Sequence, residues 1–543
     1  MKPPIITTQA GKVQGKWEVK GTIASFKGIP YAAPPVGALR WKAPQPLQPW
    51  EGIKKTTKFS AFAWQFQVFI ALFLKGIING QGWSWLHRMF ILLLTKIAPS
   101  PKQSEDCLYL NIKTPNIDES AKLPVMVWIH GGDHQDGSGA EIFYDGVAIP
   151  NKGIVYVSIN YRLGLLGYFA HPELTQESEH QVSGNYGTLD QIAALQWVQD
   201  NIAAFGGDPN NVTIFGESAG GESVAHMLTS PLAKGLFHKA ILQSPANGGQ
   251  MIHLSKDFEH IQSAEGKGLA FAKAIGVTGS NQVEQLRKMS AKQLMTFLRK
   301  QEPESNIMTH YPNIDGYVLP QSPFAAFADN NQANVPILLG SNSDEGTCLY
   351  PIFELPQADY QPLGLSDKEV VERFHHDFKG EAQPLLAFYP GLKNRDHQAE
   401  IAFLGDNMFG AKARWYAKHH AQNGNPIYYY FFKRVPPSPT QTAGAYHAAE
   451  LPFVHGTDVP ILPLDKQDKV LSAIMIDYWT NFAKTGNPNG HNHPEWLSFD
   501  TNNPQWMVLD NNNMGMNTVE REKQYQLLMA RLQRQVEAMK GLE

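Results

Sequence analysis

The chain of 543 residues has little cysteine, no excess of basic charge and no long apolar run. Its two cysteines, Cys107 and Cys348, allow one disulfide at most and suit a reducing compartment. Lys and Arg number 46 against 50 Asp and Glu, so no basic excess is available to bind a nucleic-acid backbone. Hydrophobic residues make up 43% and charged residues 18%, which excludes a disordered or collagen-like chain. We therefore expect a globular protein that does not bind nucleic acid.

Neither a signal peptide nor a membrane-spanning helix is visible in the sequence. The N-terminal residues 1–6 contain no charged region that leads into a long apolar one. Residues 66–94 are the most membrane-like stretch, but polar residues such as Lys75 and Arg88 interrupt them, and a spanning helix needs about 20 apolar residues. These observations predict a cytoplasmic protein without a transmembrane segment. They leave a lid or an interfacial contact as roles for residues 66–94.

Short apolar runs between helical patterns predict a parallel sheet. Continuous runs, rather than alternating ones, are typical of strands that helices cover on both faces. Residues 190–206 have apolar side chains at helical spacing before a Gly-Gly pair, which predicts a crossover helix. The expected strands are Val125–Ile129, Ile154–Ile159, Val212–Phe215, Ala240–Leu242, Ile337–Leu339, Ile427–Phe432 and Trp506–Leu509. The predicted fold class is α/β.

The length alone suggests roughly two to four domains. However, no internal repeat, low-complexity tract or Ser/Gly linker divides the chain. Residues 256–305 and 365–415 are predicted as helical insertions that decorate one large sheet, and residues 66–98 as an apolar, lid-like loop. We therefore expect a single catalytic domain over residues 1–543.

The central chemical feature is the pentapeptide Gly216-Glu217-Ser218-Ala219-Gly220, which follows an expected strand and precedes a helical stretch. In a nucleophile elbow the strand turns sharply into a helix and exposes the serine hydroxyl. Glycines two residues before and after the serine are needed because larger side chains would clash. The alternative is a tight structural turn with a spectator serine. The strand–turn–helix context favours Ser218 as a nucleophile.

Two later loops offer the acid and the base that a nucleophilic serine needs. The strand Ile337–Leu339 leads into a loop with Asp344 and Glu345, at the edge of the sheet where such proteins build their sites. His447 lies in a loop of small residues after the strand Ile427–Phe432. The order serine, acid, histidine is that of α/β-hydrolases. The residues alone do not choose between Asp344 and Glu345, and His447 is one of 19 histidines.

The loop His130-Gly131-Gly132-Asp133 follows the expected strand Val125–Ile129. A loop of this type carries a backbone donor for the oxyanion that develops in acyl transfer, and the N–H group of Ala219 would be another donor. Taken alone, the glycine pair is equally typical of a plain turn.

With these features the chain resembles the type B carboxylesterases, the carboxylesterase/lipase group that also contains the cholinesterases. The similar motifs are FKGIPYAAPP at 26–35, EDCLYLN at 105–111, NYRLG at 160–164, FGGDP at 205–209, FGESAGG at 215–221 and WTNFAKTGNP at 479–488. They run almost from end to end. The resemblance implies an α/β-hydrolase fold, with a large, mostly parallel central sheet covered by helices and with helical insertions around an active-site gorge.

The resemblance also implies a catalytic site and a reaction. Ser218 would be the nucleophile, Glu345 rather than Asp344 the triad acid, and His447 the base. The backbone amides of Gly132, Asp133 and Ala219 would form the oxyanion hole. The implied reaction is hydrolysis of a small carboxylic ester through an acyl-enzyme, with no metal and no organic cofactor. A buried structural ion pair between Glu105 and Arg162 is implied as well.

The chain departs from the family pattern at a disulfide. The family commonly joins the Cys of its Glu-Asp-Cys-Leu motif to an earlier Cys, but Ala63 stands where that residue would fall. Cys107 is therefore predicted to be a free thiol, which leaves residues 66–94 free to shape or cap the entrance.

The second departure lies in the oxyanion loop, where the family usually has a third glycine and this chain has Asp133. A carboxylate that points inward would oppose the developing oxyanion and could cost a few kcal/mol. One alternative is that Asp133 turns away to a partner in residues 134–139. Another is that Asp133 or His134 helps to activate the deacylating water.

Several other functions stay open on the sequence. A lipase-like, interfacial esterase would use residues 66–94, and amide or carbamate hydrolysis would use the same triad. A non-catalytic binding homologue is disfavoured because Ser218, Glu345 and His447 are all present. The sequence does not identify the ester, its acyl chain length or the oligomeric state.

Overall fold

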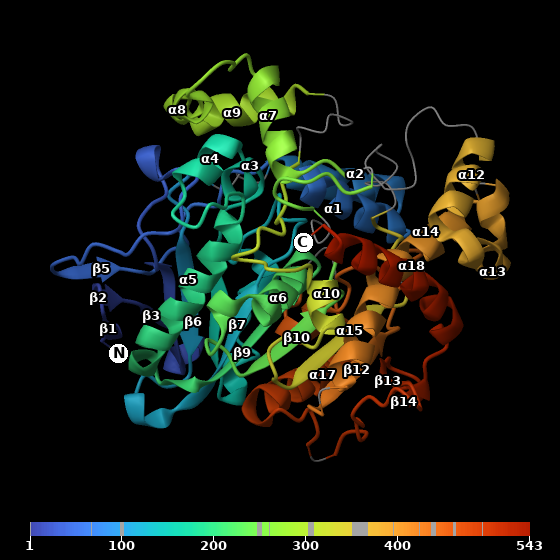
Figure 1. The fold of residues 1–543 in the computed structure, drawn as a ribbon. Coiled ribbons are helices and arrows are strands. Elements are labelled where there is room, and N and C mark those ends of the chain that lie inside the picture. The colour runs from blue at the N-terminus through green and yellow to red at the C-terminus, as the bar shows by residue number, and fades with distance from the viewer. Residues whose placement is uncertain are drawn as a thin grey trace.

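The computed structural model describes residues 2–66, 68–97, 102–246, 252–259, 261–301, 309–349, 367–394, 396–422, 424–435, 441–459, 463–490 and 492–542. An eleven-stranded sheet with the strand order β14-β13-β12-β11-β10-β9-β7-β8-β6-β4-β3 runs through them (Figure 1). Its strands are β3 (Lys16–Glu18), β4 (Ile23–Pro30), β6 (Tyr109–Thr114), β7 (Leu123–Ile129), β8 (Val155–Ile159), β9 (Gly207–Glu217), β10 (Lys239–Gln243), β11 (Ile337–Asn342), β12 (Ile427–Phe432), β13 (Gln505–Leu509) and β14 (Gly515–Thr518).

The centre of this sheet is parallel and its edges are antiparallel. From β8 through β7 and β9 to β13, every neighbouring pair is parallel, whereas β3, β4 and β6 at one edge and β14 at the other pair antiparallel. A separate small sheet contains β1 (Ile5–Thr8), β2 (Gly11–Gln14) and β5 (Ile53–Lys55). All seven strands expected from the sequence are present in the parallel part, so the prediction of a mostly parallel α/β sheet is confirmed.

The strands read as continuous apolar runs because helices bury both faces of the sheet. Alternate residues of β7 show this, since Val127 belongs to one hydrophobic cluster and Trp128 to the other. The first cluster includes side chains of α5 (Tyr186–Asn201), α6 (Ala219–Thr229), α10 (Pro323–Ala328), α15 (Ala411–Ala421) and α18 (Glu522–Lys540). The second includes side chains of α16 (Leu451–His455) and α17 (Lys466–Thr485). The predicted crossover helix corresponds to α5 and the 3-10 turn Ile202–Phe205 that follows it.

The two predicted insertions are helical, and Figure 1 places them apart on the molecule. The first forms α7 (Ala264–Ala274), α8 (Gln282–Lys288) and α9 (Ala291–Arg299), and the second forms α12 (Asp367–Phe378), α13 (Ala382–Phe388) and α14 (His397–Gly405). Helix α15 begins inside the second range but packs on β11 and β12, so it belongs to the layer that covers the sheet. Two short helices, α3 (Gly164–Tyr168) and α4 (Pro172–Glu177), follow β8. Residues 67, 98, 260, 302–305, 365–366 and 395 of the predicted segments lie outside the described residues.

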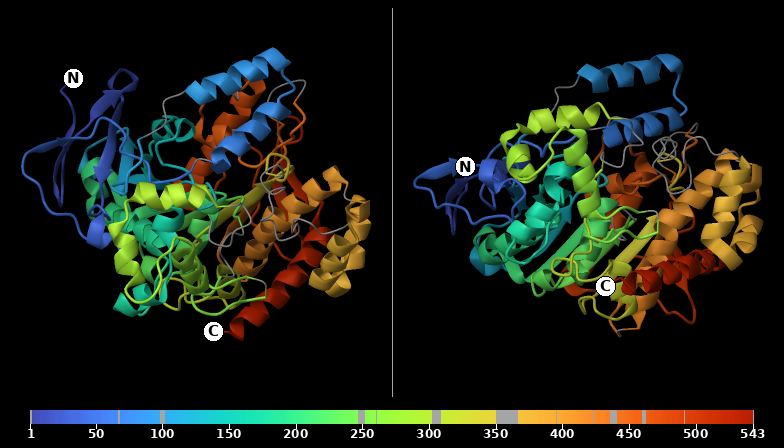
Figure 2. Two further views of the ribbon diagram at one scale, coloured as in Figure 1. Left: turned by 90° about the horizontal axis from the view of Figure 1, so that it is seen from above. Right: turned by 45° about the horizontal axis from the view of Figure 1, so that its top comes forward.

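The apolar segment predicted as a loop is instead a helical hairpin. Helices α1 (Val68–Gly80) and α2 (Trp85–Ile97) lie side by side over the body of the protein (Figure 2). The prediction was wrong because each run is long enough for more than three helical turns and is rich in Leu and other residues that helices tolerate well. Gly82, with φ +64°, lies in the short turn between them. Among the described residues, no helix combines the length and hydropathy that a membrane span requires.

Candidate active site

Ser218 lies at a sharp turn between β9 and α6. Its φ and ψ of 58° and −125° are outside the regions that most side chains adopt, so the backbone is strained there. A Cβ atom on Gly216 would lie 2.5 Å from the carbonyl carbon of Gly220, and one on Gly220 would lie 2.1 Å from the oxygen of Ile129. Both positions therefore need glycine. The turn has the geometry of a nucleophile elbow, as the pentapeptide predicts.

The predicted oxyanion loop lies directly beside this turn. A Cβ atom on Gly131 would lie 3.2 Å from the Cβ of Ser218, so the absence of a side chain allows the close approach. Gly132, Asp133 and His134 all have positive φ, of 104°, 58° and 54°. Within the described part of the chain, the N–H groups of Gly132, Asp133 and Ala219 donate to no protein acceptor. They are thus available to a developing oxyanion.

Glu345 and His447 meet at the carboxyl ends of β11 and β12. The Nδ1 atom of His447 lies 2.6 Å from Oε2 of Glu345, and because a carboxylate can only accept, Nδ1 carries the proton. The other oxygen of Glu345 accepts hydrogen bonds from Ser244 Oγ at 2.6 Å and from the N–H of Asn342 at 2.7 Å. Glu345 and His447 are each only 2% exposed. The carboxylate therefore fixes both the orientation and the tautomer of the imidazole.

Asp344, the other acid that the sequence offered, has a different role. Its carboxylate accepts hydrogen bonds from Ser343 Oγ at 2.5 Å and from the N–H of Ala445 at 2.9 Å. It thereby joins the loop after β11 to the segment that carries His447. The structure thus brings Glu345, and not Asp344, to the imidazole.

Glu217, which is not among the predicted site residues, faces the other nitrogen of His447. Its Oε1 lies 3.0 Å from Nε2, so the imidazole stands between two carboxylates. Among the described residues, Nε2 makes no hydrogen bond, and Ser218 Oγ is not its partner. In a resting enzyme such contacts are often loose and tighten when substrate binds. The signal for Glu217 was its place next to Ser218 in the elbow.

The two carboxylates control the pKa of the base. Burial lowers the pKa of His447, but the charges of Glu217 and Glu345 outweigh burial and raise it to about 9. Burial raises the pKa of Glu217 to about 8, although the charge of His447 acts in the opposite direction. The carboxyl of Glu217 and the imidazole of His447 therefore titrate as a coupled pair, in which the charge of one group changes the pKa of the other.

Asp133 turns to a partner that the sequence did not suggest. Its Oδ2 accepts a hydrogen bond from the hydroxyl of Tyr311 at 2.8 Å, rather than from a group in residues 134–139. Burial raises the pKa of Asp133 to about 7, against the lowering effect of this hydrogen bond. Two residues further along the loop, Gln135 Nε2 donates to the oxygen of His310 at 2.8 Å. Two adjacent residues thus hold the oxyanion loop, His310 through its backbone oxygen and Tyr311 through its hydroxyl.

His134, which follows Asp133 in the oxyanion loop, is fully buried. Its Nε2 lies 3.4 Å from Oε2 of Glu222 on α6, and its ring lies 5.3 Å from that of Tyr168. Burial lowers the pKa of His134 to about 3, so the ring is neutral at neutral pH. Because His134 has no exposed surface, its side chain supports the loop from inside the protein.

Aromatic rings cover the imidazole from two sides. The ring of Phe409 lies 4.4 Å from that of His447 and belongs to a π-helical turn, Asp406–Gly410, of the kind that is frequent at functional sites. The ring of Phe73 on α1 lies 6.2 Å from the imidazole on another side. Ser218 itself is 6% exposed. The hairpin of α1 and α2 therefore contributes a wall to the site as well as lying above it.

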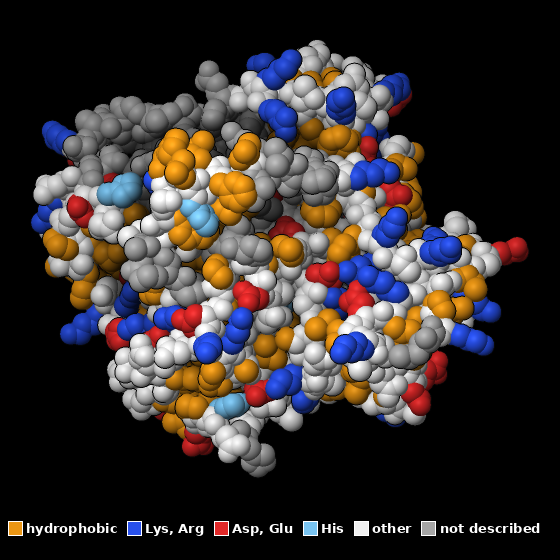
Figure 3. All heavy atoms as spheres, turned by 180° about the vertical axis from the view of Figure 1, so that it is seen from behind, with side chains coloured by type: hydrophobic (Ala, Val, Ile, Leu, Met, Phe, Trp, Pro, Cys, Tyr) orange, Lys and Arg blue, Asp and Glu red, His pale blue; other side chains and the backbone are white. Residues whose placement is uncertain are grey.

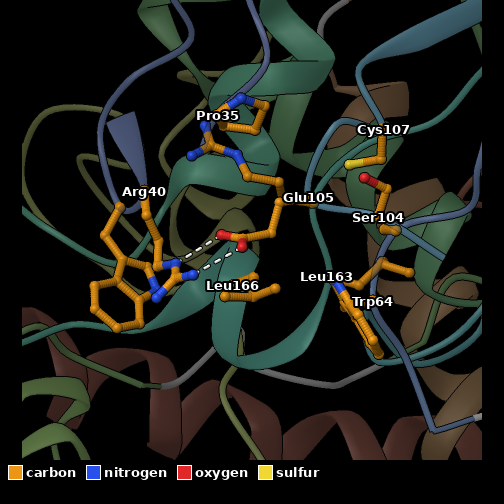
Figure 4. Close-up of a pocket in the computed structure, with 11 residues that line it drawn as sticks. Pro35, Arg40, Trp64, Ser104, Glu105, Cys107, Leu163 and Leu166 are labelled. Atoms are coloured by element: carbon orange, nitrogen blue, oxygen red, sulfur yellow. Dashed lines mark hydrogen bonds and ion pairs between the residues drawn. The ribbon is translucent and has the colours of Figure 1, made fainter. Parts of the chain in front are cut away.

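The expected ion pair between Glu105 and Arg162 is not present. Glu105 instead pairs with Arg40, at 2.6 and 2.7 Å, and both line the pocket shown in Figure 4. Arg162 forms a double hydrogen bond with the buried Asp190 on α5, at 2.7 Å for both contacts. The expectation was wrong because α5 places a carboxylate on the inner side of Arg162, where the arginine must be neutralised.

The same pocket contains the two positions at which the family commonly has a disulfide that this chain lacks. Ala63 and Cys107 both line it, together with Trp64 and Ser104 (Figure 4). Cys107 is buried and unbridged, as predicted, and burial raises its pKa well above the ordinary range. A buried, protonated thiol of this kind is not reactive.

The central parallel sheet, an elbow after β9, and an acid and a histidine after β11 and β12 define an α/β-hydrolase. A model of the carboxylesterase family matches residues 2–528. The para-nitrobenzyl esterase of Bacillus subtilis is 36% identical over 499 residues, which are 90% of this chain and 91% of that protein. Fumonisin B1 esterase of Sphingopyxis macrogoltabida is 34% identical over 510 residues, covering 91% of this chain and 84% of that protein. A solved PNB esterase structure superposes with a TM-score of 0.77 and 33% identity over 96% of this chain and 99% of the other. The chain belongs to the carboxylesterase family of type B enzymes, and it is a carboxylic ester hydrolase.

Proposed function

We propose that this carboxylesterase hydrolyses its substrates through an acyl-enzyme formed on Ser218. The observation that carries the proposal is the 2.6 Å contact between His447 Nδ1 and Glu345, which turns the opposite nitrogen toward the elbow. His447 takes the proton of Ser218 as its oxygen attacks the ester carbonyl. The negative charge that develops on the carbonyl oxygen is bound by the amides of Gly132, Asp133 and Ala219.

Collapse of this intermediate releases the alcohol and leaves the acyl group on Ser218. His447 gives its proton to the leaving oxygen and then takes one from the water that attacks the acyl-enzyme. Glu345 stabilises the positive imidazole in both half-reactions without itself becoming protonated. The second attack regenerates Ser218 and releases the acid. Every proton that moves in this cycle passes through His447.

We propose that the substrates are small esters with an apolar group next to the carbonyl. Support comes from the rings of Phe73 and Phe409, which flank His447. Amides and carbamates are the alternative substrates for the same triad. Amides differ from esters in the leaving group, an amine, which needs protonation by His447 more strongly.

A lipase-like action on aggregated esters is a second candidate, and the exposed apolar side chains of α2 favour it. In that case residues 66–94 would contact the interface between the ester phase and water. An esterase for dissolved substrates would show saturation below the solubility limit of the ester. A lipase-like enzyme would instead show a rise in rate above that limit.

The test is a series of p-nitrophenyl esters of increasing acyl length, with Ser218→Ala as the blank and the matching p-nitroanilides as the amide arm. We expect turnover of short and medium esters by the wild type and a loss of at least a thousand-fold in the variant. A fluorophosphonate should add once to the wild type, as measured by intact mass, and not to Ser218→Ala. Equal turnover or equal labelling of both proteins would refute the assignment of Ser218.

A further inference from the structure

The outer side of helix α2 is an unusually apolar surface. Trp85, Leu86, Met89, Phe90 and Leu93 are 65%, 71%, 50%, 58% and 55% exposed. Their spacing of one, three, one and three residues places all five on one face of the helix. They are five of the 15 large hydrophobic side chains exposed in the described part of the chain. Apolar patches of this kind mark surfaces that contact a partner or a lipid phase.

The five apolar side chains of this face are not needed to hold the hairpin on the body of the protein. The inner side of the hairpin already packs on the body of the protein, since Ile91 of α2 and Ile77 and Ile78 of α1 are buried. At the end of α1, the oxygen of Gly80 accepts a hydrogen bond from the N–H of Thr442 at 2.7 Å. The five outer side chains are therefore additional to those that hold the hairpin in place.

The segment that carries this face has positive charges and no negative ones. Residues 52–104 contain no Asp or Glu and seven Lys or Arg. Lys75 of α1 is exposed, and Arg88 of α2 is half-buried. Beside the start of the hairpin, the guanidinium of the exposed Arg299 lies 5.8 Å from the ring of Phe66, and Lys292 and Lys300 are exposed on and just after α9. Figure 3 shows hydrophobic side chains gathered on this side, with Lys and Arg over the neighbouring region.

These charges favour a lipid surface over a second copy of the chain as the partner of this face. A second copy of the chain would bring the same positive charges to the contact, and like charges in register oppose association. A lipid surface with anionic headgroups matches both features, because it accepts apolar side chains below the headgroups and attracts lysine and arginine beside them. Tryptophan, as at Trp85, favours this boundary because its ring is apolar and its N–H is polar.

We propose that the outer face of α2 docks the protein on an anionic lipid surface. Trp85, Phe90 and Leu93 enter the boundary between headgroups and chains, while Lys75 and Arg299 contact the headgroups. The docking itself goes beyond the proposed ester hydrolysis and does not depend on it. Its link to catalysis rests on the proposed function: Phe73 of α1 reaches the imidazole of His447, so the docked hairpin places the triad beneath the lipid face.

The experiment is sedimentation of the full chain with vesicles of phosphatidylcholine alone and of phosphatidylcholine with roughly a third phosphatidylglycerol. We expect binding to the mixed vesicles and a loss of at least tenfold in binding for Trp85→Ser/Phe90→Ser. The matched control is Val470→Ser/Leu497→Ser, which removes two exposed hydrophobic side chains elsewhere and should bind as the wild type does. Lys75→Gln/Arg299→Gln should weaken binding to the mixed vesicles several-fold and should leave the residual binding to phosphatidylcholine unchanged.

Three results would overturn the proposal. The first is equal binding by the wild type and Trp85→Ser/Phe90→Ser, and the second is binding that does not depend on phosphatidylglycerol. The third is a dimer in light scattering that Trp85→Ser/Phe90→Ser converts to a monomer, which would make the face a contact between two copies. Hydrolysis of dissolved p-nitrophenyl acetate should be the same in all these proteins. If the wild type lacks that activity but binds vesicles, the proposed catalytic function fails and the docking stands.

Discussion

The floor and the roof of the site are built in different ways. The floor consists of Ser218, Glu345 and His447, which follow parallel strands and are held by buried hydrogen bonds to neighbouring backbone and side chains. The roof is the hairpin of α1 and α2. Its Phe73 ring lies 6.2 Å from the ring of His447, and its Gly76 and Gly80 lie close to Cys348 and Ala443. The floor leaves little freedom to any of its residues, whereas the outer roof requires only apolar and basic character. The positions of the catalytic side chains therefore depend on specific local contacts, whereas the outer surface of the hairpin depends only on which types of residue it carries.

The largest effect is expected at the acid of the floor. Glu345→Gln should lower kcat by about a thousand- to ten-thousand-fold, because the amide no longer holds the imidazole in the tautomer that accepts a proton from serine. The adjacent Asp344→Asn is the matched control. It should cost about 1–3 kcal/mol of unfolding free energy, through its hydrogen bonds to Ser343 and Ala445, while activity stays within a few-fold. The reverse pattern in steady-state kinetics and denaturant unfolding would assign the triad acid to Asp344.

A disulfide that joins the two ends of the segment carrying the roof should act on stability rather than on chemistry. Ala63→Cys should form a disulfide with Cys107, since both positions line one pocket, and should raise the free energy of unfolding by up to about 4 kcal/mol. Thermal unfolding with and without reductant measures the gain, and Ala63→Ser is the control. Activity on dissolved esters should change less than about twofold. A free-thiol assay that still counts Cys107 after oxidation would show that the two positions do not meet.

The support of the oxyanion loop should have an intermediate effect. Tyr311→Phe removes the donor to Asp133 and leaves a carboxylate without a partner beside a backbone oxyanion donor. The hydrogen bond lowers the pKa of Asp133, which is about 7, so its loss raises that pKa in the variant. We expect a loss of roughly tenfold in kcat above the raised pKa, where the carboxylate is charged, and a smaller loss below it, where the carboxyl is neutral. In an Asp133→Gly background the same change should cost less than about twofold. Equal losses in both backgrounds would mean that Tyr311 acts through packing alone.

The smallest predicted effect is a shift of the pH profile. Glu217→Gln removes a negative charge 3.0 Å from Nε2, so the pKa of His447 should fall from its raised value of about 9. Because the base must be neutral to act, the acidic limb of kcat/KM should move to lower pH by about one unit. The limb is measured with a soluble ester from pH 5 to 10. An unchanged limb would show that Glu217 is already protonated in the free enzyme.

The floor could be predicted because its geometry depends on short segments. Glycines around Ser218 and acid and histidine loops after apolar strands are local patterns, and the family resemblance chose Glu345 over Asp344. The contacts of Glu217 and Tyr311 could not be predicted, since they depend on the direction of side chains in the packed structure. The expected pairing of Glu105 with Arg162 failed for the same reason: α5 brings Asp190 to the arginine. The prediction of a loop for the roof failed because its apolar runs, 68–74 and 89–94, contain no polar residue and give no clear helical period.

The strand order has a consequence for how the protein is made. From β9 to β13 the strands join the sheet in the order in which they leave the ribosome, so the last strand made is always the open edge. The serine is translated roughly ten seconds or more before its base, because a ribosome adds about 5–20 residues per second. Until β13 arrives, that edge is β12, Ile427–Phe432, whose sequence IYYYFF is wholly apolar and aromatic. A chain that stops in this interval would expose the segment best suited to pair with a neighbour, which makes the last strands a safeguard against aggregation.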